Sequence, residues 1–314
     1  MTYRMCAIIV MSMPLAASDL NAAPSTKEVM LQDVWKPSPV GVIIQIPNDT
    51  TLVMAPRDDG NEYTFGGKRL VIRAAKVKLK SVTKIRAYAE GQAPAAPSSY
   101  SAAAQPGPDG TDGGGNGQDG TAGADGRTGD PGHPAGQIAL IIGEVSGDGN
   151  LILIASGEMG GPGQIGQEGG KGGKSGRGSD SAKTWPNCDY GGGDAGNPGN
   201  GGPGGRGGKG GPGGPASSVR YTATIQEHTV VITDGALRPT LGAGKILIDL
   251  SGGPGGVPGK GGTGGDGGDG NDGGAGGGAC GGGNGKGKAP RMADQTVTLG
   301  TGDRGPSGSA SILP

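Results

Sequence analysis

Aromatic and apolar side chains are scarce in this chain of 314 residues. It contains one Phe, two Trp and six Tyr, and hydrophobic residues of every kind make up only 32% of it. A large enzyme core needs a greater share of apolar side chains. We therefore expect no side-chain-packed core over the whole length, and we expect most of the chain to be ordered through its backbone.

Residues suited to catalysis or metal binding are also few. The chain has two histidines, His133 and His228, and neither has a second His or Cys at the spacing of a zinc site. No serine stands in a Gly-x-Ser-x-Gly elbow between a strand and a helix. We therefore predict a protein that is not an enzyme, with no catalytic residue, no cofactor and no metal.

Charge of one sign is not in excess, because 27 Lys and Arg residues stand against 28 Asp and Glu. This balance argues against bulk attraction to nucleic acid or to an anionic membrane. No apolar run reaches the roughly 18 residues of a spanning helix, so we expect no membrane insertion. Residues 1–23, with Arg4 before an apolar stretch and small residues near Ala23, have the pattern of a secretory signal peptide. They predict a secreted protein, whether periplasmic, on the cell surface or extracellular.

Cysteine is almost absent. Cys6 lies in the predicted signal peptide, which leaves Cys188 and Cys280 in the exported chain. An even pair in an oxidising compartment predicts a disulfide. The alternative is two unpaired thiols on separate loops.

Glycine is abundant, with 75 residues, but only five of them precede residue 101. Before that point, short runs rich in Val, Ile and Thr predict a small β-rich domain over residues 24–91. The Pro, Ala and Ser of residues 92–106 indicate a linker. Residues 107–290 form a glycine-rich body, and residues 291–314 a C-terminal strand or tail.

The glycines of the body follow a period of three residues, as in Gly117, Gly120 and Gly123 and in the Gly-Gly-X triplets after Gly201. Three residues per turn is the repeat of a polyproline II-type helix, whose backbone groups need partners in water or in neighbouring helices. A flexible, disordered glycine linker is the alternative reading of the composition.

A longer repeat favours order. Residues 150–157 align with residues 245–252, and Gly160 and Cys188 align with Gly252 and Cys280 at an offset of 92. We therefore predict two units of about 92 residues. The expected fold is mainly β, with packed polyglycine II or polyproline II-type helices, the β-rich N-terminal unit and almost no α-helix after the signal peptide.

These Gly-Gly-X runs and the row from Gly117 to Gly132 resemble secreted bacterial collagen-like and glycine-rich proteins. They also look like the springtail antifreeze proteins and the tail-tip adhesins of some phages, in which polyglycine II helices pack side by side. The resemblance implies a role in adhesion, matrix or surface recognition. It differs from the antifreeze pattern, because Lys171, Lys174 and Asp266 occupy positions where that pattern has small residues.

If the two units lie side by side, a basic edge faces an acidic one and sets their register. These register charges are Lys171, Lys174, Arg177, Asp266 and Asp269.

The leading functional prediction is a secreted, non-enzymatic structural or adhesive protein. The alternative is a recognition module that binds through loop 179–190, where Trp185 and Tyr190 are candidate contacts. Candidate partners are a cell-surface glycan or protein, or further copies of the chain.

Overall fold

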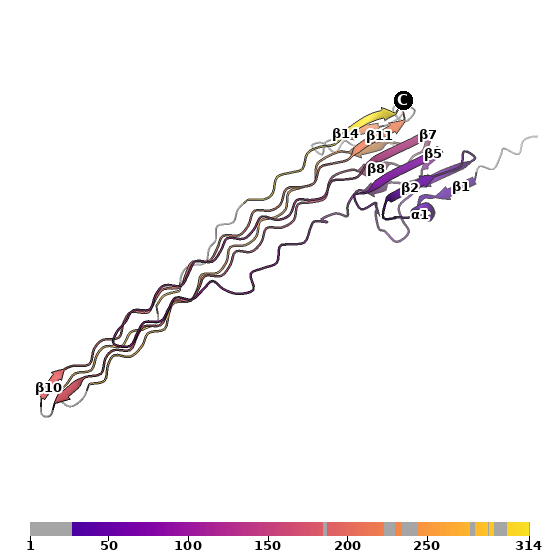
Figure 1. Ribbon diagram of the computed structural model, residues 1–314. Helices are drawn as coiled ribbons and strands as arrows, with labels where there is room; N and C mark the ends of the chain where they lie inside the picture. Colours follow the sequence, from indigo (N-terminus) through magenta and orange to yellow (C-terminus); the bar gives the residue numbers. More distant parts are fainter. Residues whose placement is uncertain are drawn as a thin grey trace, which may run out of the picture.

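The computed structural model describes residues 27–184, 187–222, 230–233, 244–276, 280–287, 289–291 and 300–313. The predicted signal peptide, residues 1–23, lies outside these residues. The described chain has two parts: a base of β-strands, and a long rod that extends from one end of the base (Figure 1).

Two sheets form the base, and every strand pair within them is parallel. The larger sheet has the order β1 (Lys27–Met30), β3 (Thr50–Met54), β5 (Arg69–Leu79), β7 (Ile138–Gly147), β11 (Ser218–Thr222) and β14 (Ser309–Leu313), with β2 (Gly41–Gln45) also paired to β5. The smaller sheet has the order β12 (Val230–Thr233), β13 (Ile246–Asp249), β8 (Leu151–Ile154), β6 (Thr83–Arg86) and β4 (Tyr63–Thr64). The single short helix, α1, spans Leu31–Val34 in the described residues.

One apolar core joins the two sheets. Along β5, Leu70 and Ile72 are buried while Arg69 and Arg73 are exposed, as the two-residue period of a strand requires. Leu153 of β8 contributes to the same cluster from the smaller sheet. The few large apolar residues of the chain are therefore concentrated in the base.

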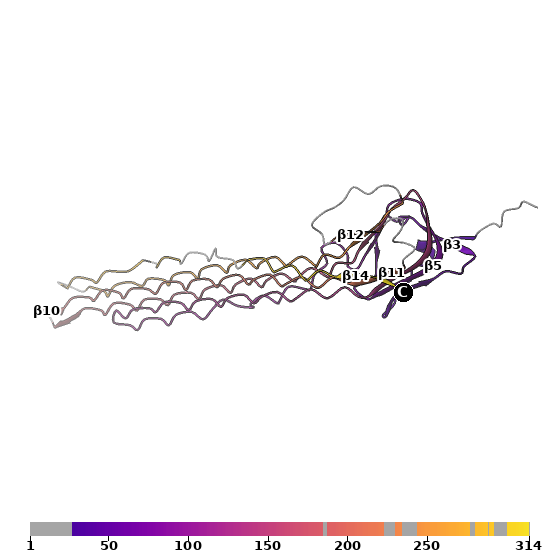
Figure 2. The same cartoon turned by 90° about the horizontal axis from the view of Figure 1, so that it is seen from above.

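The rod consists of three out-and-back excursions of the chain (Figures 1 and 2). Each excursion leaves the smaller sheet after β6, β8 or β13 and returns to the larger sheet at β7, β11 or β14. The outgoing runs are 87–112, 155–181 and 250–276, and the returning runs are 116–137, 191–217 and the described residues of 280–308. Strands of the base thus continue directly into the rod.

Neighbouring runs are joined by backbone hydrogen bonds at every third residue. In run 155–181, Gly166 donates to the carbonyl of Lys260 at 2.9 Å, and three residues later Gly169 donates to Thr263 at 2.9 Å. The backbones approach so closely that a Cβ on Gly166 would lie 2.1 Å from the carbonyl oxygen of Gly205. Glycine is therefore required at the contact positions, and the third position carries the side chain.

The predicted fold class is wrong. The regular structure of the described residues is chiefly parallel β-sheet, which fits the mainly β part of the prediction, but the rod runs there are not packed polyglycine II helices. The β-rich segment is also not a separate unit, because β5 pairs with β7 from Leu70 opposite Ile138 to Leu79 opposite Gly147. A strand needs a neighbour on each side to pair both rows of its backbone groups, and apolar β7 provides one for β5.

The two-unit body was also predicted wrongly. The chain instead makes three passes, each consisting of strands of the base and one excursion along the rod, and the first pass begins inside residues 24–91. Residues 92–106 also lie along the rod. Ala104 donates its N–H to Glu168 at 2.8 Å, and the Tyr100 hydroxyl donates to the carbonyl of Asp125 at 2.7 Å. The C-terminal segment contains β14, which pairs with β11.

Candidate functional site

The candidate recognition loop, residues 179–190, lies at the far end of the rod (Figure 1). Within it, β9 (Ala182–Thr184) and β10 (Asn187–Tyr190) form an antiparallel pair. The Tyr190 side chain is 59% exposed, whereas Trp185 lies outside the described residues. The rod therefore ends in a hairpin that presents an aromatic ring to solvent.

The base of this hairpin is tied to the adjacent runs. Ser181 donates its N–H to Ala275 at 2.9 Å, and Ala275 donates its own N–H to the carboxylate of Asp180 at 2.9 Å. Arg177 pairs with the same carboxylate at 3.1 Å. Strand β9 thus starts from an anchored backbone.

Cys280 lies beside this hairpin. It is disulfide-bonded, and its Sγ lies 3.7 Å from the carbonyl oxygen of Ala182 in β9. The backbone of Cys188 pairs with Lys183 across the hairpin, but the side chain of Cys188 lies outside the described residues. Its pairing with Cys280 stays a prediction.

The five register charges have different partners. Lys171 meets Asp269 across the rod, with Nζ 2.9 Å from Oδ2, and this hydrogen bond raises the pKa of Lys171. Arg177 instead pairs within its own run, with Asp180. Asp266 faces Arg291, with a separation of 3.8 Å.

Lys174, the remaining register charge, is held through its backbone, because its N–H donates to the Asp109 carboxylate at 2.8 Å. Opposite charges therefore do meet along this face of the rod. They form one ion pair across runs 155–181 and 250–276, whereas the sequence predicted a whole basic edge facing an acidic edge.

Sequence reasoning missed a second set of contacts, in which side chains accept outward-pointing backbone N–H groups. Asn116 accepts from Asn197, Asp119 from Asn200 and Asp125 from Arg206, at 2.7 to 2.8 Å. Asp125 also binds the guanidinium of Arg206 at 2.7 and 3.0 Å. These hydrogen bonds hold the pKa of Asp125 below its usual range.

The pattern has a sequence signal. Where run 191–217 carries Pro203, Pro212 or Pro215, no N–H exists at the third position, and the residues opposite on run 116–137 are Ala122, Pro131 and Pro134. Where an N–H exists at Asn197, Asn200 and Arg206, an Asn or Asp stands opposite. At these positions the side chains of one run match the N–H groups of its neighbour, and Lys209, with Thr128 opposite, is the exception.

A buried carboxylate lies where the rod meets the base. Glu158, with a side chain only 6% exposed, binds Nδ1 of His133 at 2.5 Å and Nε2 of Gln92 at 3.1 Å. Burial raises the pKa of Glu158, but the hydrogen bonds from His133 and Gln92 outweigh it and leave that pKa below its usual value. Three runs are therefore joined at one side chain.

No group of three or more His, Cys, Asp or Glu suited to a metal ion occurs in the described residues. The same part of the chain contains no helix long and apolar enough to cross a membrane.

Comparisons with known proteins identify no family. No protein-family model matches the chain, and no curated protein matches it. Among solved structures, a match is found to the nine polyproline type II helical bundle springtail antifreeze protein from Granisotoma rainieri. The two chains are 22% identical over 62% of this chain and 96% of that chain, with a TM-score of 0.08. At this score the likeness carries no information about fold or function.

Proposed function

We propose that the protein is a secreted, non-enzymatic structural or adhesive protein whose rod holds a contact surface away from its base. One observation carries the proposal: the rod places the β9–β10 hairpin at the opposite end of the molecule from both sheets (Figure 1). A spacer of this kind needs length and stiffness, and it needs no catalytic group.

The rod has the features of a stiff spacer. Run 155–181 is bonded to four other runs, since it donates to Asp130 and Pro254 and accepts from Gly110 and Gly214. Because bending would break hydrogen bonds on several sides at once, the rod resists bending more than a single strand or a glycine linker does.

A second candidate function is recognition of a glycan or protein through residues 179–190. The exposed ring of Tyr190 favours it, because tyrosine offers a large apolar face together with a hydroxyl group and is common in binding surfaces. In this role the rod presents the hairpin to its partner.

The test is binding of the purified exported protein to cells and to cell-surface polysaccharide. We compare Tyr190→Ala with Val257→Ala, because Val257 is a similarly exposed apolar residue, 57% exposed, on the flank of the rod. An adhesive role predicts saturable binding. Contact through the hairpin predicts about tenfold weaker binding for Tyr190→Ala, from the loss of about 1.4 kcal/mol, and no change for Val257→Ala.

The outcomes separate the two functions. Binding that both variants retain would place the contact elsewhere on the molecule and remove the recognition role of the hairpin. Absence of binding to any cell surface or matrix material would overturn the adhesive role.

A further inference from the structure

The outer face of the larger sheet has an unusual composition. Parallel sheets are normally covered on both faces and are apolar on both. Here one face packs in the core, while the other carries the exposed side chains of Arg69, Arg73 and Arg220. Nothing in the described part of the chain covers this face.

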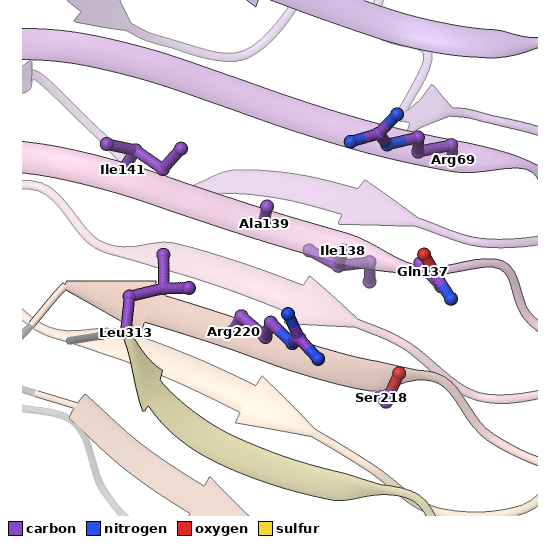
Figure 3. Close-up of a pocket in the computed structure, with 8 residues that line it drawn as sticks. All are labelled: Arg69, Gln137, Ile138, Ala139, Ile141, Ser218, Arg220 and Leu313. Carbon is purple, nitrogen blue, oxygen red and sulfur yellow. The ribbon is translucent and has the colours of Figure 1, made fainter.

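A shallow pocket of about 280 Å³ lies on this face, across β5, β7, β11 and β14 (Figure 3). The register places Arg69 beside Gln137, and Gln137 beside Ser218, in one row across three strands. Arg220 stands in the next row, beside Ala139. Polar groups therefore line one end of the pocket.

The other end of the pocket is apolar. Ala139 and Ile141 of β7 and Leu313 of β14 line it, and all three are half-buried (Figure 3). Guanidinium groups and partly exposed aliphatic groups thus share one small surface.

The two arginines of the pocket have no side-chain partner among the residues that the structure describes. Arg69 and Arg220 make no side-chain hydrogen bond or ion pair with any described residue, whereas Arg57, Arg86 and Arg206 each bind a carboxylate. Strands β5 and β11 flank β7, so the two backbones are about 9.5 Å apart. Both long side chains can reach a ligand that lies over Ala139.

We propose that this pocket binds an organic carboxylate: Arg69 and Arg220 hold the carboxylate, and Ala139, Ile141 and Leu313 contact its apolar part. The planar guanidinium fork matches a carboxylate with two parallel hydrogen bonds. The amide of Gln137 and the hydroxyl of Ser218 supply further donors at the same end.

The chemistry of the pocket favours a carboxylate over a phosphate. Phosphate sites commonly use free backbone N–H groups at a helix N-terminus or in a nest of successive amides. The pocket floor is sheet whose N–H groups are committed to ladders, as in the pairing of Ala139 with Val71 and Arg220. The aliphatic end would also contact nothing in an inorganic phosphate complex.

The experiment is an NMR titration of the full chain with hexanoate, and with hexanol and inorganic phosphate as comparisons. We expect saturable shifts of the Gln137, Ala139 and Arg220 amides with hexanoate, and at least about tenfold weaker effects with the other two compounds. Arg220→Ala and Arg69→Ala should each weaken hexanoate binding about tenfold, because each removes charge-assisted hydrogen bonds.

Two further variants keep the result interpretable. Arg220→Lys retains the charge and loses the fork, so binding should weaken although the strand is hardly disturbed. Lys260→Ala removes an exposed cation from the rod and should leave hexanoate binding unchanged. The proposal is overturned if hexanol or phosphate binds as tightly as hexanoate, if Lys260→Ala has the same effect as Arg220→Ala, or if no saturable shift occurs up to about 10 mM.

Discussion

Substitution of Gly205 by alanine tests whether close backbone contact holds the rod together. Gly205 donates its N–H to Gln167 at 2.8 Å and accepts the N–H of Gly262 at 2.7 Å. A Cβ at this position would lie 1.9 Å from the carbonyl oxygen of Ala124, whereas ordinary contacts begin at 3.4 Å. One methyl group would therefore push the neighbouring run away by about 1.5 Å.

The cost follows from the bonds that such a displacement breaks. The displaced run, 116–137, is joined to run 191–217 on either side of this contact, because Gly123 donates to Pro203 and Gly126 to Arg206, both at 2.8 Å. Each of these two hydrogen bonds contributes about 1 kcal/mol, and each buried group left without a partner costs about 1–3 kcal/mol. Gly205→Ala should therefore destabilise the rod by about 2–5 kcal/mol. Gly287→Ala is the matched control, because nothing lies within 4 Å of its Cβ position, and its effect should stay within about 0.5 kcal/mol.

The assay is thermal unfolding of both variants together with amide hydrogen exchange along the rod. Gly205→Ala should lower the midpoint and speed exchange at Gly123 and Gly126, while Gly287→Ala should match the parent protein. Equal midpoints and equal protection in the two variants would refute the argument from backbone contact.

Three further predictions concern the side chains that bind the runs together. Because the pKa of Asp125 is lowered by Arg206, its stabilising effect should be complete above the unfolded-state pKa of about 3.9 and should be lost as pH falls through the folded-state pKa. Asp125→Asn keeps an acceptor for the Arg206 N–H, so acid titration followed by circular dichroism should show a weaker pH dependence than in the parent; an unchanged profile would contradict this role. Glu158→Ala removes the acceptor of His133 and Gln92 and should cost about 1–3 kcal/mol in denaturant unfolding, more than Glu158→Gln, which keeps a carbonyl oxygen; equal losses would mean that the lost acceptor is not the cause. Peptide mapping without reductant should recover Cys188 linked to Cys280, a pairing worth about 4–5 kcal/mol in the chain-entropy model, and two free thiols would refute it.

Local features of the fold were predictable from sequence, because short-range patterns determine them. The short runs rich in Val, Ile and Thr within residues 24–91 indicated strands, and β5 is one. The alignment of residues 150–157 with residues 245–252 also has a physical basis, because Leu151 of β8 lies directly opposite Ile246 of β13. Similar strands in successive passes stack in register, so their sequence likeness reflects a spatial pairing.

Long-range pairing was not predictable in the same way. At the offset of 92, residues 138–141 of β7 correspond to residues 230–233 of β12, yet β7 pairs with β5 and β11, and β12 pairs with β13. Parallel strands carry no turn between them that fixes their order, and a buried apolar run fits any apolar neighbour. The excursion of the rod between one strand and the next further separates partners along the chain.

The candidate hairpin was located by sequence because it interrupts the glycine pattern, whereas the arginine-lined pocket was not. Arg69 and Arg220 lie in β5 and β11, and Gln137 directly precedes β7, so the three residues are far apart in the sequence, and each is an ordinary polar residue in its own segment. Only the parallel register of β5, β7 and β11 brings them together. A site built across strands therefore has no signal until the sheet order is known.

The third positions of the rod are the part of the sequence that encodes which runs are neighbours. Glycine allows two backbones to approach closely, but because it occurs in every run it does not distinguish one neighbouring run from another. An outward N–H on run 191–217, in contrast, is either removed by proline, as at Pro203, or bonded to an opposing side chain, as at Arg206 with Asp125. A shift of run 116–137 by one triplet that places Asp125 against Pro203, which has no N–H to donate, would also leave the Arg206 N–H opposite Thr128. Because both errors occur together, proline and aspartate select one register where glycine alone would accept several.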